Sequence, residues 1–335
     1  MKNPFVTNGY VSPEYFCDRE KETAKIVSLL TNENNIALIS PRRLGKTDLL
    51  RHCFGQPEIK EHYHTFIIDI YATSSVRDFV NVFGKAVLDE LRPKGKSVWG
   101  TFLNVLASLR SEITFDMNGQ PTWGIGLGAI TNPSATLDEI FSYLNNAGKP
   151  CLIAIDEFQQ ITKYADDPNI EAALRTHIQR CSNAHFVFSG SHRHLMGAMF
   201  TSPARPFYQS VTLINLPPIS VDKYAEFCLR HFERASKHLD TLVVTELYER
   251  FNGITSYMQK VMNILFSMTG TGEICIPSMI DTAINDLLDF SADTYDALLY
   301  QMPEKQRIVF MAIAAEGKAK AISSGDFVRK YKLQL

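Results

Sequence analysis

The chain has 335 residues, which at roughly 150 residues per domain predicts two domains and a smaller appendage. Hydrophobic residues make up 45% and charged residues 21%, ordinary globular values that exclude a disordered or low-complexity chain. The 34 Lys and Arg against 36 Asp and Glu leave a net charge of −2. No global positive field therefore exists to hold nucleic acid or an anionic membrane, and such a partner requires a local basic patch.

The sequence contains no sign of a membrane span, a signal peptide or a metal centre bound by cysteine or histidine. Its apolar runs are short and its first ten residues lack the apolar segment of a signal peptide, so we expect a cytoplasmic protein with no membrane partner. Six scattered cysteines without a CxxC pair predict buried free thiols. The pairs His62/His64 and His192/His194 have no third ligand nearby, which favours surface or strand histidines over a metal site.

Strand and helix patterns alternate through the first part of the chain. Continuous apolar runs predict strands buried on both faces at 34–40, 64–70, 151–158, 184–191 and 211–216. Between the second and third, residues 75–92 carry one apolar helical stripe: Val76, Phe79, Val80, Phe83, Val87 and Leu91. Parallel strands need crossover helices, so the pattern predicts a doubly wound α/β domain over residues 1–218.

Three segments break this alternation. Residues 93–133 hold six glycines and place Asn118-Gly119 between alternating runs, which predicts an inserted β-hairpin. Residues 219–299 have helical periodicity and no convincing strand, so they predict a helical second domain. Residues 300–335 carry seven Lys or Arg against three acids. They read as two helices joined by a Gly-containing turn, with Ser323 or Ser324 capping the second.

A phosphate-binding loop is predicted between the first strand and its helix. The residues Ser40 to Thr47 (SPRRLGKT) fit the pattern GxxxxGK[ST], except that Ser40 replaces the first glycine. In such a loop backbone N–H groups surround phosphate, the lysine reaches the β- and γ-phosphates, and the threonine ligates Mg²⁺. The predicted nucleotide ligands are Pro41, Arg42, Arg43, Leu44, Gly45, Lys46, Thr47 and Asp48. The alternative is a surface turn with incidental basic residues. Ser40 weakens the loop if its φ must be positive.

Two adjacent carboxylates end the third predicted strand. Asp156 and Glu157 follow the apolar run CLIAI, where two acids are costly unless something compensates them. A Mg²⁺ ion held by Thr47 and Asp156, with a water activated by Glu157, would do so. Strand ends meet at one edge of a parallel sheet, so this pair and the loop face one crevice. The alternative is that the two acids cap the following helix.

The fourth predicted strand ends in a polar turn at the same edge. Ser189-Gly190-Ser191 follows the apolar run HFVF. A side chain there can touch the attacking water or the γ-phosphate and so report which nucleotide is bound. We select Ser191, with His192 as the weaker candidate; a simple turn fits the pattern equally well.

These motifs, together with Phe16-Cys17-Asp18-Arg19-Glu20-Lys21-Glu22 and PFYQSVTLINLPP, occur in the order found in a known family. Residues 13 to about 265 resemble the archaeal-type ATPase domain family of the AAA+ superfamily. The resemblance implies a P-loop NTPase sheet of order 5-1-4-3-2, a helical lid and a following winged helix. It also implies that Phe16, Asp18 and Arg19 lie near the adenine of ATP or ADP, that Asp156 and Glu157 are the Walker B pair, and that Ser191 is the first sensor.

The chain departs from this family at two functional positions. Phe207-Tyr208-Gln209-Ser210 stands where the family tends to have Leu-Tyr-Gly-Arg, so an arginine acting across a subunit interface is missing and Arg205 is its nearest substitute. Gly253-Ile254-Thr255 replaces Gly-x-Pro in the lid, which weakens the case for nucleotide-coupled lid movement. Lys260 is a candidate lid contact to phosphate, although a solvated helix residue is the favoured interpretation.

The sequence therefore predicts an ATPase that uses Mg-ATP binding and hydrolysis as a switch between the α/β core and the lid. Its catalytic residues would be Glu157, Lys46, Ser191 and Arg205, with slow or partner-activated turnover. One alternative is a nucleotide-sensing scaffold with little turnover, which the departures at Ser40, Ser210 and Thr255 support. A P-loop kinase is less favoured because of Glu157 and the lid.

The partner of the C-terminal segment is left open by the sequence. Residues 300–335 resemble the start of a winged helix, and their charge of +4 could contact DNA phosphates. The sequence stops before a further recognition helix and wing, so we expect an incomplete domain and give protein docking equal weight with DNA binding. The oligomeric state is likewise not predicted.

Overall fold

The computed structural model describes residues 2–91, 113–115, 121–123, 133–317 and 319–333. Within the predicted insertion, β3 (Ile113–Phe115) pairs antiparallel with β4 (Pro121–Trp123). The predicted Asn118-Gly119 turn lies outside the described residues.

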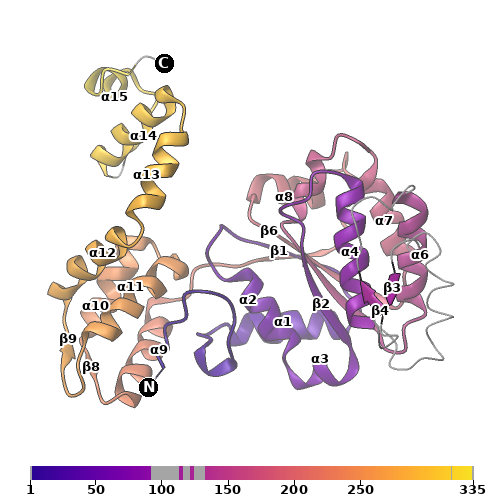
Figure 1. The fold of residues 1–335 in the computed structure, drawn as a ribbon, viewed down its shortest axis with the longest axis horizontal. Helices are drawn as coiled ribbons and strands as arrows, with labels where there is room; N and C mark the ends of the chain where they lie inside the picture. Colours follow the sequence, from indigo (N-terminus) through magenta and orange to yellow (C-terminus); the bar gives the residue numbers. More distant parts are fainter. Residues whose placement is uncertain (1, 92–112, 116–120, 124–132, 318, 334–335) are drawn as a thin grey trace.

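Five parallel strands form the central sheet (Figure 1). They are β1 (Ile36–Ile39), β2 (His64–Asp69), β5 (Cys151–Asp156), β6 (Ala184–Gly190) and β7 (Thr212–Asn215). Their order is β2-β5-β6-β1-β7, and every neighbouring pair is parallel. Counted in chain order and read from β7, this is 5-1-4-3-2, which confirms the predicted topology.

Helices cover both faces of this sheet, because side chains of alternate residues in the inner strands β1, β5 and β6 point to opposite faces and all are buried. The prediction of burial on both faces is wrong for the edge strands β2 and β7, which are only partly buried; Leu213 of β7 is 38% exposed. One face carries α1 (Glu20–Thr31), α2 (Lys46–Phe54) and α3 (Pro57–His62). The other carries α4 (Val76–Leu91), α6 (Pro133–Asn145), α7 (Ile170–Arg180) and α8 (Arg193–Thr201). The predicted stripe on α4 is confirmed: its first five members are buried, and Leu91 is partly buried.

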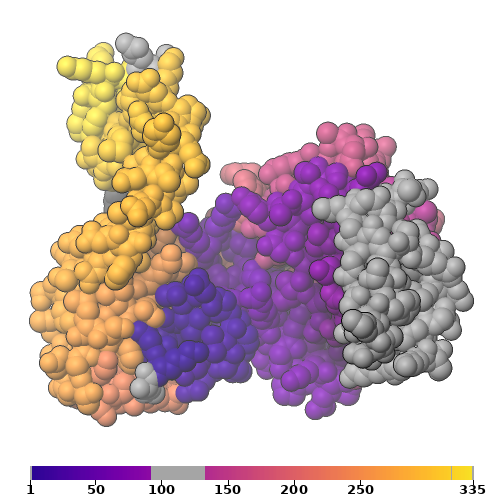
Figure 2. Space-filling view, in the orientation of Figure 1, coloured from indigo at the N-terminus to yellow at the C-terminus, as the bar shows by residue number. Residues whose placement is uncertain are grey.

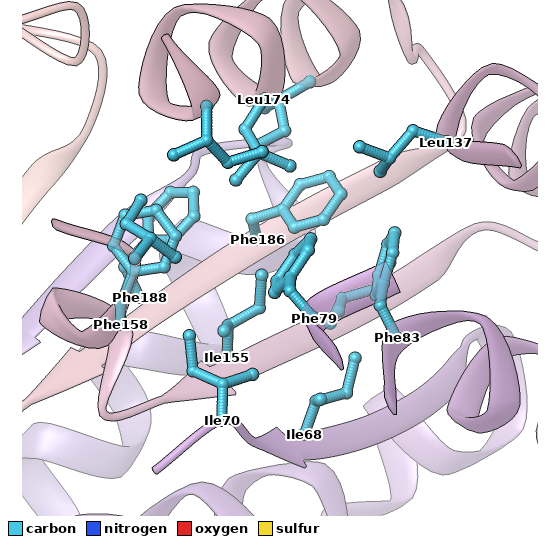
Figure 3. Packing of buried hydrophobic residues seen from close by; sticks show 14 of the residues in the cluster. Ile68, Ile70, Phe79, Phe83, Leu137, Ile155, Phe158, Leu174, Phe186 and Phe188 are labelled. Atoms are coloured by element: carbon cyan, nitrogen blue, oxygen red, sulfur yellow. The ribbon is translucent and has the colours of Figure 1, made fainter. Parts of the chain in front are cut away.

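An aromatic cluster fills the core on the α4 side (Figure 3). Phe158 lies in a short 3-10 helix, η3 (Phe158–Lys163), directly after the predicted catalytic carboxylates. Its ring packs against those of Phe188 and Phe207, with centroids 4.4 and 5.4 Å away. All three rings are at most 1% exposed. The segment that follows Glu157 is therefore anchored by a large buried apolar area.

A second, helical unit follows β7. It contains α9 (Val221–Arg234), α10 (Thr241–Phe251), α11 (Thr255–Met268), η4 (Pro277–Met279) and α12 (Ile280–Asp289) around its own core. The expectation that it holds no strand was wrong, because β8 (His238–Leu239) pairs in parallel with β9 (Ile274–Cys275). Strands of two residues are too short to show a period in the sequence. We refer to residues 219–289 as the lid.

Three further helices follow the lid: α13 (Ala292–Gln301), α14 (Glu304–Glu316) and α15 (Gly325–Lys330). The hydroxyl of Ser324 accepts a hydrogen bond from Phe327 N, as predicted for the start of the last helix. Ala312, Phe327 and Leu333 form a small core between α14 and α15. Elsewhere in the chain, the six cysteines are all free and buried, as expected. Among the described residues, no helix has the length and apolarity required to traverse a bilayer.

Segments near the N-terminus lie between the α/β domain and the lid (Figure 2). A 3-10 helix, η1 (Pro13–Tyr15), precedes α1, and the residues before it reach the lid. Phe5 is fully buried in the lid core, and its backbone C=O accepts a hydrogen bond from Asn263 Nδ2 at 2.7 Å. We call residues 3–11 the N-terminal strap. It ties the lid to the start of the α/β domain.

Candidate functional site

The carboxyl ends of the central strands meet at one edge of the sheet. Ile39 of β1 lies opposite Gly190 of β6, and Asp69 of β2 lies opposite Asp156 of β5. The residues that follow these strands therefore emerge side by side, as the sequence predicts for the loop and the acidic pair. The site is built at this edge.

The loop between β1 and α2 has the conformation of an anion-binding turn. Arg43 and Gly45 adopt left-handed conformations, with φ of 70° and 83°, and α2 begins immediately afterwards at Lys46. Ser40 is not among the residues with positive φ, so its side chain introduces no backbone strain at the position of the missing glycine. A Cβ atom added at Gly45 would have no neighbour within 4 Å, so the backbone there faces open space.

Lys46 is held inside the loop. Its side chain is nearly buried, at 7% exposure, and Nζ donates to the backbone oxygens of Ser40 and Pro41 at 3.2 and 3.3 Å. Burial lowers the pKa of Lys46 below its usual value, an effect that Asp156 and Glu157 oppose and Arg42 reinforces. The ammonium group thus lies near charges of both signs, and among the described residues its hydrogen-bond partners are the backbone carbonyls of Ser40 and Pro41.

The predicted metal ligands are in contact. Thr47 Oγ1 donates to Asp156 Oδ2 at 2.5 Å, and Asp156 is 6% exposed. The other carboxylate oxygen, Oδ1, accepts from the backbone N–H of Glu157 at 3.0 Å. A hydroxyl and a carboxylate oxygen therefore lie together beside Lys46, which is the oxygen-rich donor set that Mg²⁺ prefers.

Glu157 faces the same centre and does not cap the next helix. It has a left-handed backbone, with φ of 54°, and its side chain makes no capping hydrogen bond to η3. Instead, Oε2 accepts hydrogen bonds from Ser191 Oγ at 2.8 Å and from Gln159 Nε2. Ser191 Oγ in turn accepts from Arg42 Nε at 3.3 Å. The structure thus joins the loop, the acidic pair and the predicted sensor in one network.

A cavity of about 430 Å³ lies over this network. Its volume falls within the range of roughly 300–1,000 Å³ that is usual for small-molecule sites. Eleven predicted site residues line it: Phe16, Arg19, Arg42, Arg43, Leu44, Gly45, Lys46, Thr47, Asp48, Asp156 and Glu157. Burial raises the pKa of Asp48, and Arg51 opposes this increase. The charged residues gather at the loop, whereas the other end of the cavity is mostly uncharged.

The uncharged end contains residues that the sequence motifs do not indicate. The strap contributes five of them: Val6, Thr7, Gly9, Tyr10 and Val11. The ring of Phe16 stacks on His52 with centroids 4.4 Å apart, and Tyr10 Oη hydrogen-bonds to His52 Nδ1 at 3.1 Å. Burial lowers the pKa of His52, which favours a neutral ring there. No periodicity marks the strap, so only its position in the fold connects it with the site.

The lid reaches the loop through the start of α11. The backbone N–H of Ser256 donates to Arg43 O at 3.2 Å. The Arg43 guanidinium donates to Tyr257 Oη, and its Cζ lies 4.9 Å from the centroid of that ring. Just before α11, Gly253 has φ of 68°, and a Cβ atom there would lie 2.8 Å from the Tyr248 ring. Glycine is therefore required at this turn.

Six other candidate residues do not line the cavity: Asp18, Pro41, Ser191, His192, Arg205 and Lys260. Ser191 reaches the site through Glu157, and Pro41 through its carbonyl. Arg205 forms an ion pair with the nearly buried Glu171 on α7. Burial raises the pKa of Glu171 and Arg205 opposes this increase. From the lid it is Thr255, Ser256 and Gln259 that line the cavity.

Comparison with known families agrees with this geometry. Residues 16–261 match a family model described as an ATPase domain predominantly from Archaea. The chain belongs to this ATPase domain family. Residues 293–335 match a second model, described as a probable winged helix domain. A search of curated proteins gave no significant match.

Solved structures similar to this ATPase domain protein include a Walker-type ATPase of Pyrococcus abyssi, with a TM-score of 0.61 and 17% identity over 98% of this chain and 87% of that one. The ORC2 protein of Aeropyrum pernix, solved with ADPNP and ADP, has a TM-score of 0.60 and 15% identity over 98% and 82%. The ORC1 protein of the same organism, solved with DNA, has a TM-score of 0.58 and 14% identity over 99% and 81%. At these identities the likeness concerns the fold.

Proposed function

We propose that this protein binds ATP in the cavity and hydrolyses it with the help of Mg²⁺. The observation that carries the proposal is the arrangement of Lys46, Thr47, Asp156 and Glu157 around one end of that cavity. A buried acid and a buried ammonium group, with the partly buried Glu157 beside them, are expensive unless they act together on a charged ligand. A nucleotide triphosphate with its divalent cation is such a ligand.

The residues present fit this ligand at both ends of the cavity. At the loop end, Gly45 leaves open space where backbone N–H groups and the start of α2 can meet phosphate oxygens. At the other end, Arg19 is 3% exposed; its Nη1 donates to Glu22 at 2.9 Å, but its buried Nη2 has no partner among the described residues. The ring of Phe16, which is backed by His52, supplies an apolar wall of the cavity. A purine base fits this combination of flat apolar surface and unused donor.

The proposed chemistry assigns one task to each residue. Lys46 contacts the β- and γ-phosphates, while Thr47 and Asp156 hold Mg²⁺, which supplies charge neutralisation for the phosphates. Glu157 accepts a proton from the water that attacks the γ-phosphorus, the bond from this phosphorus to the β–γ bridging oxygen breaks, and ADP and inorganic phosphate are released. Arg42 and Ser191, already hydrogen-bonded to one another, are placed to respond to the presence of the γ-phosphate.

We further propose that this cycle moves the lid. Arg43 belongs to the phosphate loop and also contacts Ser256 and Tyr257 of the lid, so a change in the loop conformation alters both contacts. The strap adds a second connection, because it lines the cavity and ends in the lid core. These contacts provide coupling without the proline that the family tends to have before α11.

The experiment that tests the proposal compares the wild type with Glu157→Gln, using Glu61→Gln on the exposed surface of α3 as the matched control. Loss of the general base lowers turnover by about 100-fold or more, while ATP affinity changes little. Phosphate release measures the rate and calorimetry measures the affinity. Equal rates for wild type and Glu157→Gln would remove Glu157 from the mechanism, and an absence of ATP binding would remove the function itself.

A second candidate function, a nucleotide sensor with little turnover, is favoured by one observation. Arg205, the nearest substitute for the missing arginine of the family, is engaged in an ion pair with Glu171 and is therefore not free to act across a subunit interface. Removing an arginine of that kind costs about 1,000-fold or more in rate. Single-turnover assays with and without candidate partner proteins distinguish the sensor from a partner-activated ATPase.

The C-terminal helices are proposed as a second binding module, with DNA or a protein as the partner. The match to a winged helix model and the basic residues of 300–335 support both. The ORC1 protein of Aeropyrum pernix has been solved with DNA, which makes duplex DNA the first ligand to test. An affinity that falls with rising salt supports phosphate contacts, and one that does not favours a protein partner.

A further inference from the structure

Gln159 lies between the proposed general base and the end of β6, and no motif assigns it a role. It is 3% exposed and belongs to the short helix η3. Its side-chain Nε2 donates to Glu157 Oε2, while its Oε1 is buried and has no hydrogen-bond partner among the described residues. A buried amide with an unsatisfied oxygen is costly, and in the part of the chain that the structure describes the contact with Glu157 is the one polar interaction of this side chain that can offset the cost.

The two donors around Glu157 converge on the same oxygen. Ser191 Oγ and Gln159 Nε2 both donate to Oε2, whereas Oε1 accepts no hydrogen bond from the described part of the chain. Glu157 lines the cavity. A carboxylate fixed through one oxygen cannot rotate freely, and its other oxygen is left to accept the proton of a water molecule.

The backbone of Gly190 makes room for this arrangement. A Cβ atom at Gly190 would lie 2.3 Å from Gln159 Oε1 and 2.6 Å from Met196 Cγ. Any larger residue at the end of β6 would therefore displace the amide that touches Glu157. The glycine precedes Ser191, so the two donors to Glu157 are placed by the same strand end.

We propose that Gln159 is a positioning residue for Glu157, holding Oε2 so that Oε1 is directed to the attacking water. The inference rests on the proposed hydrolysis of ATP. Gln159 acts only through Glu157, so its loss lowers kcat and leaves the ATP affinity and KM essentially unchanged.

The test compares Gln159→Met, which keeps the length of the side chain and removes the donor, with Gln160→Met as matched control. Gln160 lies next in the chain and donates to the backbone oxygen of Thr73 at 2.9 Å, without a hydrogen bond to Glu157. We expect kcat to fall by about tenfold to 100-fold in Gln159→Met, as for the loss of one hydrogen bond to a charged group. We expect the kcat of the control to stay within about twofold.

A double variant separates positioning from a general loss of packing. The Glu157→Gln variant lacks the carboxylate that Gln159 is proposed to position. Adding Gln159→Met to it should therefore change kcat by less than about twofold, whereas the losses in kcat from two independent effects would multiply. If Gln159→Met does not fold, Gln159→Leu, which is also uncharged and has no donor, replaces it, and kcat should again fall at unchanged KM.

The outcomes distinguish a failure of the proposed role of Gln159 from a failure of the proposed ATP hydrolysis. If ATP binds and Glu157→Gln is inactive, but Gln159→Met turns over like the wild type, the positioning role is wrong and the ATPase assignment stands. Multiplicative losses in the double variant, or a rise in KM equal to the fall in kcat, also overturn the positioning role. If Glu157→Gln itself hydrolyses ATP normally, the proposed mechanism fails first.

Discussion

The cavity has two sides of different chemistry. The α/β domain supplies its charged residues, including Lys46 and Asp156, each less than a tenth exposed and each in contact with another part of the site. The lid supplies uncharged residues: Ile219, Thr255, Ser256 and Gln259. Gln159 and Gln259 show the contrast, since the former touches Glu157 whereas the latter accepts from Tyr224 Oη within the lid at 2.9 Å.

The residues proposed to bind and cleave the phosphate therefore come from the α/β domain, and the parts that can change position come from the lid and the strap. The charges that can bind phosphate and cleave it come from strand ends of a single sheet, which is rigid because both of its faces are buried. The lid and strap can change position without carrying any charged group out of the site. Substitutions on the α/β side should therefore abolish binding or hydrolysis, and substitutions on the lid side should alter affinity and movement by smaller factors.

The largest effect on affinity is expected for Lys46→Met. Removing one partner of a buried charge interaction costs about 2–5 kcal/mol, so ATP affinity should fall by at least ~30-fold. Burial lowers the pKa of Lys46, which means that the folded wild type holds the charged ammonium group at a cost in stability. The Lys46→Met variant does not have this cost, so its melting temperature should not fall. Calorimetry and thermal unfolding measure both. Lys60→Met, on the exposed surface of α3, is the control.

The same pKa shift predicts a pH dependence. The pKa of Lys46 is lowered in the folded protein, so its proton is lost at a lower pH than that of an exposed lysine. ATP affinity should therefore decline as the pH rises through this lowered pKa, and the decline should be absent in Lys46→Arg, since arginine stays protonated. A flat profile for the wild type would contradict the assignment of Lys46 as the phosphate contact.

An intermediate effect is expected when the strap is detached. Phe5→Ala removes the buried ring that fixes the strap in the lid. In this variant, the strap residues that line the cavity must become ordered when ATP binds. Ordering a residue costs about 1–2 kcal/mol, so ATP binding should weaken by ~10-fold. Val244→Ala is the matched control, because it also truncates the lid core but lies on α10. Equal losses in the two variants would mean that the strap has no role of its own.

The smallest effect is expected at the contact between the loop and the lid. Tyr257→Ala removes a hydrogen bond and a cation–π contact with Arg43. Such contacts near the surface contribute about 0.5–1 kcal/mol, so affinity should change by no more than ~5-fold. Amide exchange at Ser256, whose N–H donates to Arg43 O, should become faster and no longer respond to nucleotide. Tyr257→Phe, which keeps the ring, should fall between this variant and the wild type.

Residues close in sequence made much of the site predictable. The strand, loop and helix from Ile36 to Phe54 are contiguous, so the loop type and the contact between Lys46 and the loop carbonyls follow from local chemistry. The position of the acidic pair followed from the rule that parallel strand ends meet at one edge. The short strands β8 and β9 were not predicted, because two residues carry no periodic pattern. Whether Ser40 strains the phosphate loop was decided only by its backbone conformation, since its φ is not positive.

By itself, the sequence determined the buried strands and the charged end of the cavity, because both depend on apolar runs and on motifs a few residues long. The order of the strands in the sheet was implied by the family resemblance. Only the tertiary structure decided how the lid and strap meet this end. Arg43 and Tyr257 are 214 positions apart, and Phe5 and Asn263 are 258 apart. Contacts over such separations arise from packing of whole elements, which the local pattern of a single chain does not encode.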